Sequence, residues 1–255
     1  MKREIFKYAY PDGTRRNVYV LLPNKLETNT RLRTLYMFDG EATIIESEYS
    51  KENWGVVEAI EAKGITDLAV VAMDHAGDER MQEYLPFDLE YEGKSYTARG
   101  KEFSEWLKYD LIPYLESKYH FDNNRQSRYL AGSSMGGIIT ASFSAILKDT
   151  FSKFGVFSLA SFIFPENSFY DFLDKYVINN DSSYYLYVGD KEGYYDFNDT
   201  EDEKITKFYI DEFNRFNKYL KTKNIMDVKT RIGKNCNHSE KSWKTYLPEF
   251  VEMLK

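Results

Sequence analysis

Short apolar runs alternate with longer amphipathic stretches along the chain. The apolar runs have the length of β-strands, and the run DLAVVAMD at 67–74 is continuous enough to suit a strand buried on both faces of a sheet. Strands that alternate with helices are typical of an α/β fold. The predicted strands cover 16–23, 33–40, 67–74, 127–132, 183–190 and 227–233, with an extra strand at 153–160.

Three amphipathic stretches predict helices that pack their apolar stripes against the sheet rather than holding a cofactor. Pro113 lies inside the first of them and is expected to kink it. Thr200 and Glu203 have the spacing of a capping box at the start of the second. The stripes run over 103–115, 205–220 and 243–254.

The segment DHAGDERMQEYLPFDLEYEGKSYTA at 74–98 breaks this rhythm because it is polar and aromatic. It follows the end of a predicted strand, and we expect a long loop there. Loops of this length inside compact domains are often functional. The acidic residues and His75 at its start lack the H-E-x-x-H spacing of a helical zinc site, so no metal site is predicted.

The motif GSSMG at 132–136 lies between a predicted strand and the apolar helix pattern GGIITASFSAIL. This is the context of the nucleophile elbow G-x-S-x-G, whose small flanking residues allow a sharp strand-to-helix turn. Only Ser134 has glycines two positions to each side, so it is the candidate nucleophile, and the side chain of Ser133 is expected to turn away. The N–H of Met135 would point toward the developing oxyanion. A glycine–serine turn without chemistry is the alternative, which the strand–helix context disfavours.

A reactive serine needs a base and an acid that orients the base. In folds with this elbow they follow the nucleophile along the chain, the acid first and the histidine last. The chain has three histidines, and His75 and His120 precede Ser134, which leaves His238 as the candidate base. His238 stands between the last predicted strand and the last predicted helix, in GKNCNHSEKSW.

The acid is expected at the end of the predicted strand 183–190 or just after it. Asp190 and Glu192 are the first candidates, and the residues alone do not separate them. Asp196 and Asp199 are further candidates. Each could equally be a surface carboxylate in an acidic loop.

A second oxyanion donor is expected in the loop FDGE at the end of the predicted strand 33–40. Gly40 allows the backbone to turn, and Gly40 or Glu41 would supply a backbone N–H beside that of Met135. The side chain of Glu41 need not take part.

Four segments resemble the esterase D/enterochelin esterase-like branch of the α/β-hydrolase superfamily. They are AGSSMGG, LYMFDGE, VGDKEG and NHSEKSW, and the resemblance extends from about Val18 to the last helix. It implies a single α/β-hydrolase domain over 1–255, with a mostly parallel central sheet, helices on both faces and no large lid. It also implies Ser134 as nucleophile, His238 as base and the Glu41 N–H as oxyanion donor.

The resemblance also bears on the acid and on the pocket. The family's acid follows a Gly-x-x pattern after the penultimate strand, which favours Glu192 over Asp190. The segment DERMQEYLPF resembles the same branch, so Arg80 and Glu83 are candidates for the pocket rim, with surface charges as the alternative. Aromatic residues near the predicted strand ends would suit an aromatic or sugar ester, or else pack in the core. They are Tyr84, Phe87, Tyr194, Tyr195 and Phe197.

Composition narrows the classes of function further. With 34 basic and 41 acidic residues the net charge is −7, which argues against binding nucleic acid or an anionic membrane surface. The single cysteine, Cys236, excludes a disulfide framework and a cysteine zinc cluster. The charged start MKREIFKYAY lacks a signal-peptide pattern, and no apolar stretch has the length of a membrane span, so a cytoplasmic protein is expected.

These observations predict a serine carboxylester hydrolase that acts on a small-molecule ester through an acyl-enzyme, with neither a metal nor an organic cofactor. A thioesterase or an acyltransferase with the same triad is the first alternative. A siderophore ester hydrolase and a non-catalytic binding protein on the same fold are less favoured, and a homo-oligomer is left open.

Overall fold

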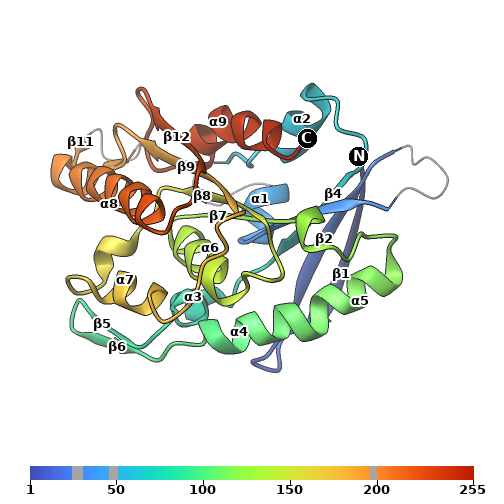
Figure 1. Cartoon of the computed structure of the whole chain (residues 1–255), viewed down its shortest axis with the longest axis horizontal. Coiled ribbons are helices and arrows are strands. Elements are labelled where there is room, and N and C mark those ends of the chain that lie inside the picture. Colours follow the sequence, from blue (N-terminus) through green and yellow to red (C-terminus); the bar gives the residue numbers. More distant parts are fainter. Residues whose placement is uncertain (25–30, 46–50, 196–199) are drawn as a thin grey trace.

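The computed structural model describes residues 1–24, 31–45, 51–195 and 200–255. Within them, an eight-stranded sheet runs through the middle of the molecule (Figure 1). In spatial order its strands are β1 (Lys2–Ala9), β2 (Arg15–Leu22), β4 (Leu68–Met73), β3 (Arg33–Met37), β7 (Arg128–Ser133), β8 (Lys153–Phe157), β9 (Ser183–Gly189) and β12 (Asp227–Gly233). β2 pairs antiparallel with β1 and β4, and every pair from β4 to β12 is parallel. The prediction of a mostly parallel sheet is confirmed.

Helices cover both faces of this sheet (Figure 1). One face carries α2 and α9, and the other carries α4, α5, α6 and α8. The helix bounds are α1 (Gly40–Ile44), α2 (Val56–Ala62), α3 (Arg80–Tyr84), α4 (Gly100–Trp106), α5 (Ile112–Lys118), α6 (Met135–Ile146), α7 (Ser168–Leu173), α8 (Glu203–Thr222) and α9 (Glu240–Glu252). Two short strand pairs, β5 (Leu89–Tyr91) with β6 (Lys94–Tyr96) and β10 (Tyr194–Tyr195) with β11 (Thr200–Glu201), lie outside the main sheet.

The burial of β4 explains its continuous apolar run. Successive side chains of a strand point to opposite faces, and every residue of β4 is buried. Val70 and the residues two positions to each side of it pack in the core beneath α2 and α9. Val71 and the residues two positions to each side of it pack in the core beneath α4 and α6. A strand that contributes to two cores must be apolar at every position.

Two expectations about the first half of the chain need correction. The sequence pattern did not predict β1, which is an edge strand with one exposed and one half-buried face. Apolar residues lie on both faces, Ile5 on the exposed one and Phe6 on the half-buried one, so polar and apolar residues do not alternate along it. The segment 74–98 is not one irregular loop, because it contains α3 and the β5–β6 hairpin. The hairpin turns at Glu92 and Gly93, both with positive φ. These elements are too short for their periodicity to stand out.

Two helix details also differ from the expectation. Asp202 caps α8, because its carboxylate accepts from the N–H groups of Lys204 at 3.0 Å and Ile205 at 3.1 Å, so Thr200 is not the cap. Pro113 lies at the start of α5, directly after a π-helical turn over Leu107–Leu111 that joins α4 to α5. The wider turn relieves the clash between the proline ring and the preceding carbonyls. No helix in the described part of the chain combines the length and apolar character needed to cross a membrane.

Candidate active site

Ser134 occupies a strained turn between β7 and α6. Its backbone has φ 57° and ψ −120°, a conformation that non-glycine residues rarely adopt and that costs about 1–3 kcal/mol. The surrounding backbone holds it there. The Ser134 N–H donates to the Phe157 carbonyl at 3.0 Å, and the Ser134 carbonyl accepts from the N–H groups of Gly137 and Ile138. The strand–turn–helix context expected for the motif is therefore present.

The glycines around Ser134 are required by close packing between β7, α6 and β8. A Cβ atom on Gly132 would lie 2.5 Å from the Gly136 carbonyl oxygen. A Cβ on Gly137 would lie 3.0 Å from the Phe157 carbonyl oxygen. Any larger side chain would push the helix away from the strand and change the turn that presents Ser134.

His238 and Glu192 form a close pair on the loops that follow β12 and β9. The His238 Nδ1 lies 2.5 Å from the Glu192 Oε2. An ionised carboxylate only accepts hydrogen bonds, so the neutral imidazole carries its proton on Nδ1 and leaves Nε2 free to accept one. The ring packs between Tyr209, at 4.8 Å between centroids, and Trp243, at 5.1 Å. These contacts fix both the tautomer and the orientation of the ring.

Glu192 is fully buried, and hydrogen bonds satisfy its second oxygen. Oε1 accepts from the Ser158 hydroxyl and from the Gly189 N–H, each at 2.6 Å. The Trp243 indole N–H donates to the same Ser158 hydroxyl at 2.9 Å. Ser158 directly follows Phe157, whose carbonyl holds the Ser134 N–H, so the end of β8 connects the elbow to the His238–Glu192 pair.

Asp190, the other candidate acid, binds backbone instead of His238. Its Oδ1 accepts from the Cys236 N–H at 3.2 Å, and its own N–H donates to the Gly233 carbonyl at 2.9 Å. The Lys191 N–H donates to the Cys236 carbonyl at 2.9 Å. These bonds fasten the loop after β9 to the loop that carries His238. Asp196 and Asp199 lie outside the described residues.

The loop after β3 approaches the end of β4 closely. Asp39 has φ 54°, and α1 begins at Gly40. A Cβ on Gly40 would lie 2.8 Å from the Met73 carbonyl carbon and 2.9 Å from the Asp74 nitrogen, so only glycine fits there. The Glu41 N–H donates to the Asp74 carboxylate at 3.1 Å. Burial raises the pKa of Asp74, although hydrogen bonds from Asn17 and Tyr19 oppose this.

Arg80 forms a bidentate pair with Asp39, with Nε–Oδ1 at 2.7 Å and Nη2–Oδ2 at 2.9 Å. Burial alone would raise the pKa of Asp39, but the Arg80 guanidinium outweighs it and lowers that pKa. The Tyr84 hydroxyl also contacts Asp39 at 3.2 Å. Tyr84 is fully buried, and its ring packs against Phe38 with centroids 5.4 Å apart, so it belongs to the core instead of lining an open pocket.

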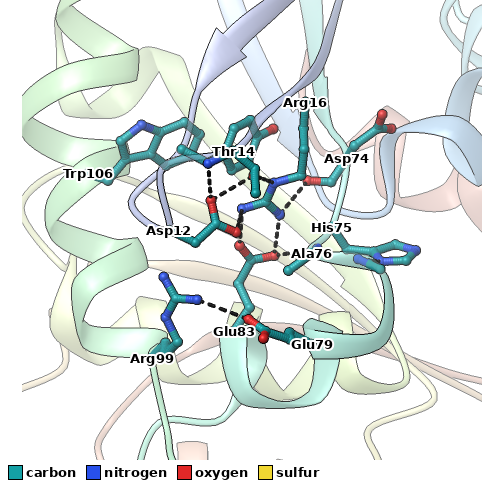
Figure 2. Close-up of polar contacts among 12 residues, drawn as sticks. Asp12, Thr14, Arg16, Asp74, His75, Ala76, Glu79, Glu83, Arg99 and Trp106 are labelled. Carbon is teal, nitrogen blue, oxygen red and sulfur yellow. Dashed lines mark hydrogen bonds and ion pairs between the residues drawn. The ribbon is translucent and has the colours of Figure 1, made fainter.

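Glu83 lies in a buried ion-pair cluster and not at a surface rim (Figure 2). Its carboxylate accepts from the Arg16 guanidinium at 2.7 and 3.0 Å and from the Ala76 N–H at 3.1 Å. Arg16 also donates to the Asp12 carboxylate at 3.1 Å and to the Asp74 backbone carbonyl at 3.4 Å. The cluster holds the backbone at 74–76. Sequence reasoning missed Arg16, because its partner lies 67 positions away and no local pattern connects them.

The remaining pocket candidates are more scattered. Tyr194 lines a cavity of about 370 Å³ together with Cys236 and polar residues of the neighbouring loops, and Ser134, Glu192 and His238 do not line it. The Phe87 ring packs on the rings of Phe164 and Phe172, with centroids 4.8 and 5.4 Å apart. Phe197 and the side chain of Tyr195 lie outside the described residues. In the described part of the chain, no three His, Cys, Asp or Glu side chains gather in a way that could hold a metal.

Comparison with known proteins gives one family and one fold. The model of the family named Esterase matches residues 12–255. The BES protein from Bacillus cereus has a similar fold, with a TM-score of 0.76 and 15% identity over 99% of this chain and 94% of that one. The siderophore hydrolase EstA from Aspergillus nidulans also has a similar fold, with a TM-score of 0.77 and 14% identity over 99% of this chain and 95% of that one.

A third similar structure is S-formylglutathione hydrolase FrmB from Staphylococcus aureus, with a TM-score of 0.68 and 17% identity over 99% of this chain and 96% of that one. At such identities the likeness concerns the fold, which is of the α/β-hydrolase type. The predicted fold class is confirmed.

Proposed function

The chain belongs to the esterase family and is an esterase, and from this premise we propose that it hydrolyses carboxylic esters through a triad of Ser134, His238 and Glu192. The observation that carries the proposal is the pair of half-buried His238 and buried Glu192, joined through Ser158 and Phe157 to the strained turn at Ser134. A buried acid, an oriented imidazole and a partly exposed elbow serine are the parts that acyl transfer to serine requires.

In the proposed mechanism, His238 Nε2 takes the proton of the Ser134 hydroxyl as its oxygen attacks the ester carbonyl carbon. Glu192 holds the Nδ1 proton and stabilises the imidazolium that forms. When the tetrahedral intermediate collapses, the bond to the alcohol oxygen breaks and His238 returns its proton to that oxygen. Water then attacks the acyl-enzyme with the same assistance, which releases the carboxylic acid and regenerates the Ser134 hydroxyl.

The oxyanion would be bound by backbone N–H groups. Met135 is the first residue of α6, and the first N–H groups of a helix have no partner within it. The Glu41 N–H is the proposed second donor. Loss of one such donor typically lowers the rate by about 100- to 1000-fold. The proposal needs neither a metal nor an organic cofactor.

The substrate is proposed to be a small ester, with aromatic or sugar esters as the first class to test. The names of two structural neighbours, a siderophore hydrolase and an S-formylglutathione hydrolase, add siderophore esters and thioesters to the test panel. An added alcohol in the assay would reveal acyl transfer as a second product.

The direct test of the triad is the variant Ser134→Ala. We expect it to abolish hydrolysis of a short p-nitrophenyl ester and covalent labelling by a fluorophosphonate, because both need the Ser134 oxygen. Ser133→Ala is the matched control and should keep both, since Ser133 is buried on the neighbouring strand end. Retained labelling in Ser134→Ala, or its loss only in Ser133→Ala, would contradict the proposal.

A further inference from the structure

The Asp74 carboxylate accepts a hydrogen bond from the Glu41 backbone N–H, which is the donor that the proposed oxyanion would need. Its Oδ1 accepts from the Glu41 N–H at 3.1 Å. An oxyanion bound to the same N–H would also lie about 3 Å from that nitrogen. Two negative oxygens would then share one donor, and charges so close repel each other strongly in a partly buried site. The Asp74 carboxylate therefore lowers turnover unless its charge is neutralised or it moves away from the Glu41 N–H.

No arginine or lysine in the described part of the chain forms an ion pair with this carboxylate. Arg16 reaches only the backbone carbonyl of Asp74, and its guanidinium is engaged by Glu83 and Asp12. Figure 2 shows the Asp74 carboxylate turned away from that cluster. Arg80 is paired with Asp39. No ion pair to Asp74 occurs among the described residues, and its carboxylate is instead surrounded by the neutral side chains of Asn17 and Tyr19.

The backbone of Asp74 is also held firmly in this place. Its backbone N–H donates to the Asn17 carbonyl at 3.1 Å, and its carbonyl accepts from Arg16. The next residues are tied down by the bond from the Ala76 N–H to buried Glu83. A carboxylate on so firmly anchored a backbone, beside a candidate oxyanion donor, is suited to be a recognition group, because it favours any substrate that brings a positive charge to it.

This inference rests on the proposed function. We propose that Asp74 determines specificity by selecting esters with a cationic group next to the reacting carbonyl. The cation binds the Asp74 carboxylate, the carboxylate leaves the Glu41 N–H, and that N–H binds the oxyanion. Neutral esters of the same shape are poorer substrates because the carboxylate stays on the N–H.

The test compares esters that differ only in charge. On the acyl side, the ethyl ester of trimethylammonioacetate is matched with ethyl 3,3-dimethylbutanoate. On the alcohol side, choline butyrate is matched with 3,3-dimethylbutyl butyrate. Acid release at constant pH gives kcat/KM for each ester. The ratio of cationic to neutral ester is then compared between the wild type and Asp74→Asn, which cancels the intrinsic reactivity of each ester.

Asp74→Asn keeps an oxygen that can accept from the Glu41 N–H but removes the charge. We expect the cationic preference to fall by at least about tenfold in one of the two pairs, with kcat/KM rising for the neutral ester. Asp78→Asn, an exposed charge removal on the same segment, should leave the ratio unchanged. Asp74→Asn should also speed the labelling of Ser134 by a neutral fluorophosphonate, which uses the same oxyanion donors.

Ratios in Asp74→Asn within about twofold of the wild type for both pairs would overturn the inference, as would an equal loss of activity on cationic and neutral esters. If Ser134 is labelled normally while the ratios stay constant, the inference alone fails. If neither wild-type turnover nor labelling of Ser134 occurs, the proposed function itself fails.

Discussion

Asp190 and Glu192 are two positions apart, and their side chains point to different partners. Glu192 turns inward to His238, Ser158 and the Gly189 N–H, whereas Asp190 binds the Cys236 N–H. The residues alone could not separate the two, because the direction of each side chain depends on a loop more than 40 residues further along the chain. The resemblance to a family pointed to Glu192, and the contacts are those a triad acid needs.

This difference gives a prediction at the scale of single residues. Glu192→Gln removes the charge that holds the Nδ1 proton, so kcat for a p-nitrophenyl ester should fall by roughly 100- to 10,000-fold with little change in KM. Asp190→Asn, the matched control, should lower kcat far less, since the Asp190 carboxylate accepts from the Cys236 N–H and not from His238. Steady-state kinetics on both variants measures this. A larger loss in Asp190→Asn would reverse the assignment.

At the scale of elements, the sequence predicted seven of the eight strands of the main sheet and helical stretches over 103–115, 205–220 and 243–254. Short apolar runs indicated the strands, and helical periodicity indicated the helices. It did not predict β1, α3 or the β5–β6 hairpin. β1 is an edge strand that mixes polar and apolar residues on both faces, and the others are short segments whose structure depends on tertiary contacts. The buried pair of Arg16 on β2 and Glu83 on α3 is such a contact, and no local sequence pattern predicts it.

The Arg16–Glu83 pair fastens α3 to the sheet, which leads to a stability prediction. Glu83→Gln leaves the largely buried Arg16 guanidinium without its main counter-charge, so the free energy of unfolding should fall by about 2–4 kcal/mol. Lys207→Met breaks the exposed pair with Asp211 and should cost at most about 0.5 kcal/mol. Urea unfolding followed by circular dichroism measures both. Equal effects of the two substitutions would show that the cluster does not hold this segment.

At the scale of the whole molecule, two cores share one sheet, so we expect the chain to unfold as a single domain. The ring centroids of Trp54 and Trp243 lie 5.3 Å apart in the core beneath α2 and α9. Trp106 lies in the core on the other face of the sheet. The strands between them contribute side chains to both cores, which couples the two faces.

The tryptophans allow this expectation to be measured on each face separately. Trp106→Phe leaves tryptophan fluorescence only from the core beneath α2 and α9. The double variant Trp54→Phe/Trp243→Phe leaves tryptophan fluorescence only from the core on the other face. Within each variant, the urea midpoint by fluorescence should coincide with the midpoint by far-UV circular dichroism. Separate midpoints in either variant would instead indicate two independently unfolding units within residues 1–255.

The bonds between the loops after β9 and β12 have a consequence for loop grafting. The Asp190 N–H and carboxylate bind Gly233 and Cys236, the Lys191 N–H binds the Cys236 carbonyl, and a Cβ on Gly189 would lie 2.1 Å from that same carbonyl oxygen. The two loops therefore form one exchangeable module although 40 residues of chain separate them. A chimera that takes only one of them from a relative would separate Glu192 from His238, so the two must be transplanted together.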